Sequence, residues 1–131
     1  MVTLVDTSAW IEYLRGTESN AHIALRGLVK DGGASLTEPV IMEVLQGGRS
    51  PRHTRQLEGL LSRASLIRVE SGDFAEAAFL YRLCRAKGDT IRSSVDCLIA
   101  AVAIRTRTPV LQQDKDFEVL ARHTPLELAA G

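Results

Sequence analysis

Three acidic residues, Asp6, Glu43 and Asp96, are each the only charged residue of an apolar stretch. An ionised carboxylate is costly to bury unless a cation, a network of hydrogen bonds or a shifted pKa compensates for the lost hydration. Three such residues in one short chain indicate that they share a cation. Because carboxylate oxygens are hard ligands, the expected ion is Mg²⁺ or Mn²⁺.

Two further acids, Asp114 and Asp116, follow an apolar segment over 110–112 that we expect to be a strand. If this strand lies beside the first strand, and the helices with Glu43 and Asp96 cover the same edge, all five carboxylates converge on one pocket. No histidine or cysteine falls at the spacing of zinc ligands. The histidines are expected at the surface: His22, His53 and His123. A carboxylate-bound ion favours phosphate chemistry, because it can activate water and offset charge on phosphoryl oxygens.

Each acid also has an ordinary structural explanation. Asp6 and Asp114 could simply cap helices, and Asp96 could complement the dipole at a helix N-terminus. Glu43 could pair with an arginine. The stretch around Asp6 leaves both interpretations open, because it ends a strand, where α/β folds place their ligands, and precedes a helix. The five acids taken together favour a metal site.

The elements that must position these acids alternate between strands and helices, which predicts an α/β fold with a parallel sheet flanked by helices. Strands are expected over 2–5, 34–36, 65–69 and 110–112, with a possible edge strand over 126–128. Helices are expected over 8–15, 18–30, after Thr37 as far as Gly47, over 51–62, from Ser71 to Gly88, from Ser93 or Ser94 to Thr108, and from Asp114 to Arg122. Thr7 or Ser8 is expected to cap the first helix. The helix around Asp96 is so apolar that it should pack centrally.

The composition indicates a single ordinary domain of 131 residues with a formal net charge of zero. The chain therefore lacks the basic excess of a protein that holds nucleic acid by charge alone. Cys84 and Cys97 are expected to be reduced thiols in the core. No apolar run is long enough to span a membrane, and the N-terminus lacks the features of a secretory signal, so we expect a cytoplasmic location.

Four motifs in order carry a resemblance to a known family. They are VDTSAWI (5–11), EPVIMEVL (38–45), TIRSSVDCLIA (90–100) and DKDF (114–117). With them the chain resembles PIN-domain ribonucleases, specifically the VapC toxins of bacterial toxin-antitoxin pairs. The resemblance implies a single PIN domain over 1–131, with three α/β/α layers around a mainly parallel sheet of four to five strands.

The resemblance also implies an endoribonuclease that depends on Mg²⁺, or on Mn²⁺ in its place. In such enzymes metal-activated water attacks an RNA phosphodiester and leaves a 5′ phosphate and a 3′ hydroxyl. The catalytic, metal-binding carboxylates carry over to Asp6, Glu43, Asp96 and Asp114, with Asp116 as an assisting acid. Thr7 or Ser8 would support the first acid. Arg92 would hold an acid or the scissile phosphate, or form only a salt bridge.

The partners that the resemblance implies are RNA, with transfer or ribosomal RNA as the expected substrate, and a small VapB-type antitoxin whose tail enters the acidic pocket. A homodimer, and a heterotetramer or larger assembly with antitoxin, are also expected. One departure from the family is Gln112-Gln113, where relatives often carry Thr, His or Asn.

Two other functions remain open from the sequence. A haloacid-dehalogenase-type phosphatase would use Asp6 as a nucleophile, but that class has a second Asp two residues later, where this chain has Ser8. A non-catalytic PIN-like module would bind RNA or a partner without turnover.

Overall fold

The computed structural model describes residues 2–130, and a parallel four-stranded sheet lies at the centre of this part of the chain. The strands are β1 (Thr3–Val5), β2 (Ala34–Leu36), β3 (Ser65–Leu66) and β4 (Val110–Leu111). Their order is β3-β2-β1-β4, and every neighbouring pair is parallel. In the register, Leu4 lies opposite Ser35 on one side and Val110 on the other. The first strand is thus interior, as its apolar sequence predicts.

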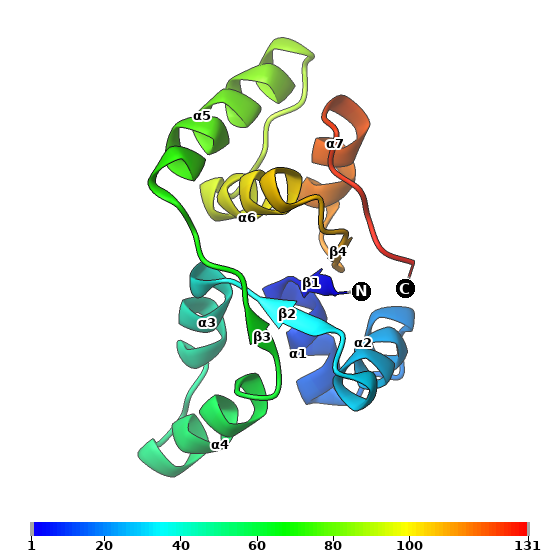
Figure 1. The fold of residues 1–131 in the computed structure, drawn as a ribbon, viewed down its shortest axis with the longest axis vertical. Helices are drawn as coiled ribbons and strands as arrows, with labels where there is room; N and C mark the ends of the chain where they lie inside the picture. Colours follow the sequence, from blue (N-terminus) through cyan, green and yellow to red (C-terminus); the bar gives the residue numbers. More distant parts are fainter. Residues whose placement is uncertain (1, 131) are drawn as a thin grey trace.

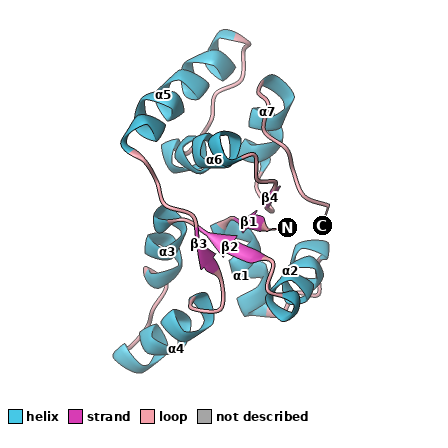
Figure 2. Cartoon of the chain, in the orientation of Figure 1, coloured by secondary structure: helices cyan, strands magenta, loops and turns pink. Residues whose placement is uncertain are grey.

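Seven helices within residues 2–130 cover the sheet. They are α1 (Thr7–Arg15), α2 (Asn20–Asp31), α3 (Glu38–Leu45), α4 (Pro51–Leu61), α5 (Ser71–Ala86), α6 (Ser94–Thr106) and α7 (Lys115–His123). Helices α1 to α4 form one packed group and α5 to α7 another, and the two groups lie on opposite sides of the sheet (Figures 1 and 2). The predicted α/β class with three layers is confirmed.

The core is continuous across the sheet and is closed by both helical layers. Trp10 of α1 and Phe117 of α7 are its largest fully buried side chains. Helix α6 buries Asp96, Cys97 and 99–103, so it packs centrally, as predicted. None of the helices described is long and apolar enough to cross a membrane. Cys84 and Cys97 are free and buried, and burial raises the pKa of both thiols.

Several predicted boundaries are wrong, for identifiable reasons. Helix α2 begins at Asn20, not residue 18, because Glu18 has a φ of 57° and cannot continue a helix. Strand β3 ends at Leu66 rather than Val69, since the Val69 N–H donates to the Glu38 carboxylate (2.8 Å) instead of to a strand.

The C-terminal edge strand and two helix caps also differ from expectation. The expected strand over 126–128 is a single bridge between Val110 and Leu128. Helix α5 is capped by Glu70 and Asp73 in a capping box, with Ser71 already helical. Asp6, not Thr7 or Ser8, caps α1.

His22 is buried, contrary to the expectation that all three histidines lie at the surface. Its Nδ1 accepts a hydrogen bond from the Glu18 N–H (2.9 Å), and its ring packs edge-on against Tyr13. These contacts satisfy the imidazole inside the α1–α2 interface. His53 and His123 are half-buried.

Candidate functional site

The site forms where β1 and β4 end side by side. Asp6 directly follows β1, and its N–H donates to the carbonyl of Leu111, the last residue of β4 (2.9 Å). The chain after β4 then supplies Asp114 and Asp116 at the same edge. Parallel neighbours bring their carboxyl ends together, which is why α/β folds place ligands there.

Asp6 both caps a helix and contributes to the acidic site. Its Oδ2 accepts hydrogen bonds from the Ser8 N–H (3.0 Å) and the Ser8 hydroxyl (2.6 Å). Its Oδ1 is buried and has no hydrogen-bond partner. Burial raises the pKa of Asp6 to about 6, although the bonds from Ser8 act in the opposite direction, and the charge of Glu43 raises it further. The two interpretations that the sequence left open are therefore compatible.

Asp96 lies in the first turn of α6, where its carboxylate is buried. Its Oδ2 also has no hydrogen-bond partner. Burial and then the negative charge of Asp6 raise the pKa of Asp96 to about 9, with Asp114 and Asp116 adding to the effect. Without a cation, the folded protein therefore holds a proton here at neutral pH.

Asp114 and Asp116 complete a cluster with Asp96, because one oxygen from each lies within 4.8 Å of the other two. Asp116 is held by two backbone amides, since the N–H groups of Arg92 and Ser93 donate to its two oxygens (3.2 and 3.1 Å). Asp114 caps α7 by accepting from the Asp116 N–H (2.9 Å). The loop before α6 and the start of α7 thus position each other.

Arg92 forms ion pairs with both of these acids. Its Nη2 lies 3.3 Å from Asp114 Oδ1 and its Nε 3.5 Å from Asp116 Oδ1. The side chain is nevertheless 72% exposed, so the guanidinium remains accessible from solvent. Of the roles considered from the sequence, contact with the acids is the one present in this structure.

Glu43 lies on the α3 side of the site and is linked to α1 by Thr7. The Thr7 hydroxyl donates to Glu43 Oε1 (2.7 Å). Glu43 is close enough for its charge to raise the pKa of Asp6, but it is not part of the tight group that Asp96 forms with Asp114 and Asp116. Thr7 therefore supports Glu43, whereas Ser8 supports Asp6.

The Gln112-Gln113 segment has contacts that sequence reasoning missed. Gln112 Oε1 accepts from the Asp114 N–H (2.6 Å), and the Gln113 N–H donates to the Ser8 hydroxyl (2.9 Å). The segment therefore fixes Asp114 and connects β4 to the support of Asp6. The departure of Gln112-Gln113 from the family pattern was visible in the sequence, but the hydrogen-bond partners of these two residues could be identified only from the fold. The bond from the Ser93 backbone N–H to Asp116 could not be predicted either, because a backbone amide leaves no pattern in the sequence.

The donor set suits a hard divalent cation. Two buried carboxylate oxygens, one on Asp6 and one on Asp96, lack partners, and a buried charge normally pairs or binds a metal. The grouped ligands are all oxygens, and neither a histidine nor a cysteine belongs to the group among the described residues. The residues present therefore fit a hard divalent cation that prefers oxygen ligands better than they fit zinc.

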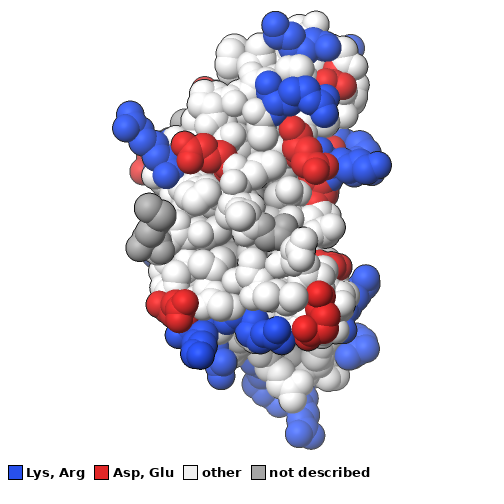
Figure 3. Space-filling view, turned by 90° about the vertical axis from the view of Figure 1, so that its right-hand side faces the viewer, with Lys and Arg blue, Asp and Glu red and all other residues white. Residues whose placement is uncertain are grey.

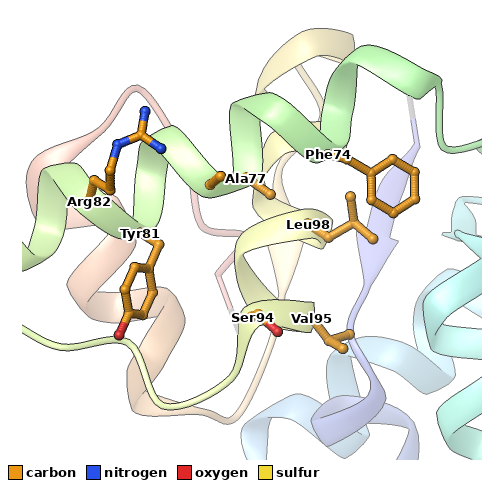
Figure 4. A pocket seen from close by; sticks show the side chains of 8 residues that line it. Phe74, Ala77, Tyr81, Arg82, Ser94, Val95 and Leu98 are labelled. Atoms are coloured by element: carbon orange, nitrogen blue, oxygen red, sulfur yellow. The ribbon is translucent and has the colours of Figure 1, made fainter.

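Other surface features lie apart from these acids. An apolar groove between α5 and α6 is lined by Phe74, Tyr81, Val95 and Leu98 (Figure 4). On the face shown in Figure 3, acidic and basic side chains are interspersed around a largely uncharged band. This distribution agrees with a formal net charge of zero and does not form a continuous basic surface on that face.

Comparisons with known proteins agree with this geometry. The PIN domain family model matches residues 3–123. The chain is 42% identical over 130 residues to VapC ribonuclease Mb1587 of Mycobacterium bovis and to ribonuclease VapC11 of Mycobacterium tuberculosis, with 97% of both chains covered in each case.

Solved structures share the fold. VapBC2 from Rickettsia felis, bound to a promoter DNA fragment, has a TM-score of 0.77 at 21% identity, with 98% of both chains covered. DNA-bound VapBC from Salmonella typhimurium has a TM-score of 0.78 at 19% identity, again with 98% of both chains covered. By its matching domain model and its ribonuclease relatives, the chain belongs to the PIN-domain family, in the group of VapC ribonucleases.

Proposed function

We propose that the chain is a VapC-type endoribonuclease toxin that hydrolyses RNA phosphodiester bonds with a divalent cation, Mg²⁺ or Mn²⁺. Asp6, Glu43, Asp96 and Asp114 would be its catalytic carboxylates, and Asp116 a further metal ligand. The observation that carries the assignment is the pair of buried, unpartnered oxygens on Asp6 and Asp96. Membership of the VapC ribonuclease group supports the substrate class.

The residues of the chain contribute to this reaction mainly by orientation. Ser8 holds Asp6 Oδ2, which leaves the buried Oδ1 without a protein partner and free to bind a cation. The backbone amides of the loop before α6 hold Asp116 beside Asp96. A cation bound there would activate the attacking water and offset negative charge on the phosphoryl oxygens. The exposed guanidinium of Arg92 would contact the scissile phosphate once the cation compensates Asp114 and Asp116.

The proposed products are a 5′ phosphate and a 3′ hydroxyl, and the substrate is transfer or ribosomal RNA. We also propose that a VapB-type antitoxin neutralises the chain, that the chain forms a homodimer, and that both act in the cytoplasm. The VapBC complexes among its structural neighbours support the antitoxin. An acidic pocket also attracts a basic side chain from such a partner.

A phosphatase of the haloacid dehalogenase type is less well supported. Ser8 stands where that class has its second Asp, and its hydroxyl and N–H are both bonded to Asp6 Oδ2. A non-catalytic module would not need the intact set of acids.

The test is RNA cleavage by Asp6→Asn and Asp96→Asn, read by sequencing RNA 5′ ends after incubation with total bacterial RNA. Both variants should lose at least about 100-fold in rate while keeping the wild-type circular dichroism spectrum. Glu76→Gln is the matched control, because Glu76 is exposed on α5 and should leave the rate unchanged. EDTA should abolish cleavage, and Mg²⁺ should restore it.

Three outcomes would reject the assignment. Full activity of both variants, or wild-type activity in EDTA, would remove the carboxylate-held cation from the reaction. Phosphate release from a small phosphoester with a trapped aspartyl phosphate would favour the phosphatase. Mg²⁺ binding without cleavage of any cellular RNA would favour the binding module.

A further inference from the structure

A polar groove of about 660 Å³ adjoins the acidic site. It lies between the start of α2 and the segment that links β4 to α7. Its walls include Asp114, which belongs to both the groove and the acidic cluster. The other side chains that line it can all form hydrogen bonds: Glu18, Ser19, Asn20, Gln112, Gln113, Lys115 and Glu118. A chain of RNA entering the site therefore has a polar cavity beside the position of reaction.

The amide of Gln112 is oriented by the fold. The backbone N–H of Asp114 can only donate, so the atom 2.6 Å from it must be the carbonyl oxygen of the Gln112 side chain. This contact fixes which end of the amide is the oxygen, an assignment that is otherwise ambiguous. The Gln112 NH₂ group is left to donate to a ligand in the groove.

The charges of the groove do not favour a phosphate as that ligand. Asp114, Glu118 and Glu18 are acidic, whereas Lys115 is the one basic residue of the lining. From outside the lining, Arg92 pairs with Asp114 and Arg26 with Glu18 (3.3 Å each). Glu118 and Lys115 then remain as opposite charges, so the groove has no positive excess to attract a phosphate. An uncharged group that offers both acceptors and donors fits such a lining better, and a nucleobase is an uncharged part of RNA that offers both along one edge.

We propose that this groove binds one nucleobase next to the scissile phosphodiester and selects a keto base, guanine or uracil. This inference rests on the proposed function for its RNA substrate. A keto base carries a carbonyl oxygen beside an imino N–H. Its oxygen accepts from the Gln112 NH₂ group, and its N–H donates to the Glu118 carboxylate. Adenine has neither group, and cytosine lacks the imino N–H.

Two isosteric substitutions test the proposal. Gln112→Glu keeps the oxygen that accepts from Asp114 but replaces the NH₂ donor with an acceptor, and Glu118→Gln removes the carboxylate charge. One measurement is the base preference at cleavage sites in an RNA library of random sequence. The wild type should favour guanine and uracil at one fixed position, and each variant should reduce that preference by about tenfold. Glu76→Gln should preserve it.

A second measurement does not depend on cleavage. Fluorescence anisotropy compares the binding of single-stranded decamers of uridine and adenosine to the wild type and to both variants. The wild type should bind the uridine decamer about tenfold more tightly, and the difference should shrink in Gln112→Glu. If this pattern appears without cleavage, the nuclease assignment fails and the base-binding groove stands.

Other outcomes overturn the groove proposal. Cleavage with no base preference at any flanking position would do so while leaving the nuclease assignment intact. Equal weakening of both decamers by Gln112→Glu would mean that the amide contacts a phosphate. Failure of the wild type to bind either decamer or to cleave RNA would reject both proposals.

Discussion

Replacing Asp96 with Asn should stabilise the metal-free protein, although it should abolish nuclease activity. Asp96 is 5% exposed, and its pKa is raised to about 9 from an ordinary value of 3.8. The folded protein thus retains a proton that the unfolded chain releases at neutral pH. The contribution of Asp96 to the free energy of unfolding must therefore fall as the pH rises from about 4 to about 9. Asparagine is uncharged at every pH and does not carry this cost.

The size of the effect follows from the difference between the two pKa values. One pKa unit corresponds to about 1.4 kcal/mol, so retaining the proton at neutral pH costs about 4 kcal/mol. Near pH 5 the same calculation gives a cost of about 2 kcal/mol for retaining the proton. Each kcal/mol shifts the melting temperature of a domain of this size by about 4 °C. The Asp96→Asn protein should therefore melt about 15 °C higher than the wild type at neutral pH, and about half as much higher near pH 5.

Thermal unfolding followed by circular dichroism in EDTA, at neutral pH and near pH 5, measures both differences. Asp73→Asn is the matched control, because Asp73 is also buried but is paired with Arg105 (2.9 Å), which lowers its pKa. The control should destabilise the protein at neutral pH. Adding Mg²⁺ should raise the melting temperature of the wild type and have much less effect on Asp96→Asn. The reasoning is refuted if Asp96→Asn melts below the wild type in EDTA, or if the difference does not depend on pH.

Two further predictions concern single side chains. Ser8→Ala removes the hydroxyl bond that favours ionised Asp6 and keeps the bond from the backbone N–H, so the pKa of Asp6 should rise. Mg²⁺ binding, measured by calorimetry over a pH series, should then require a higher pH; an unchanged profile would mean that the Ser8 hydroxyl does not tune this acid. Trp10→Ala should lower the free energy of unfolding, measured in urea, by about 3–5 kcal/mol, because the Trp10 side chain of α1 is fully buried in the core. A loss below about 1 kcal/mol would show that the core closes around the cavity left by the indole.

The sequence was informative wherever a residue type conflicted with its neighbours. Asp6, Glu43 and Asp96 stood out because charge is costly in apolar surroundings, and the fold places them at one edge of the sheet. Alternation of apolar runs and helical spacing was likewise enough to predict a parallel sheet flanked by helices, since both patterns are local. The central position of α6 followed from its apolar composition alone.

Contacts between distant segments could not be predicted in this way. The bond from the Gln113 N–H to the Ser8 hydroxyl joins residues 105 positions apart, and no local pattern encodes it. His22 appeared polar and exposed, yet its ring is satisfied by the Glu18 N–H and packs against Tyr13. The end of β3 depended in the same way on a single acceptor, Glu38, from another part of the chain.

The order of the strands also determines when the site can assemble during synthesis. Strand β1 is made first, but its neighbour β4 and the acids after it belong to the last quarter of the chain. A nascent polypeptide that ends between residues 97 and 109 would hold Asp6, Glu43 and Asp96 but lack both Asp114 and the partner that closes the edge of β1. Since a ribosome covers the most recently added residues, the edge of β1 stays open and the set of acids stays incomplete until the residues beyond 116 have left the ribosome.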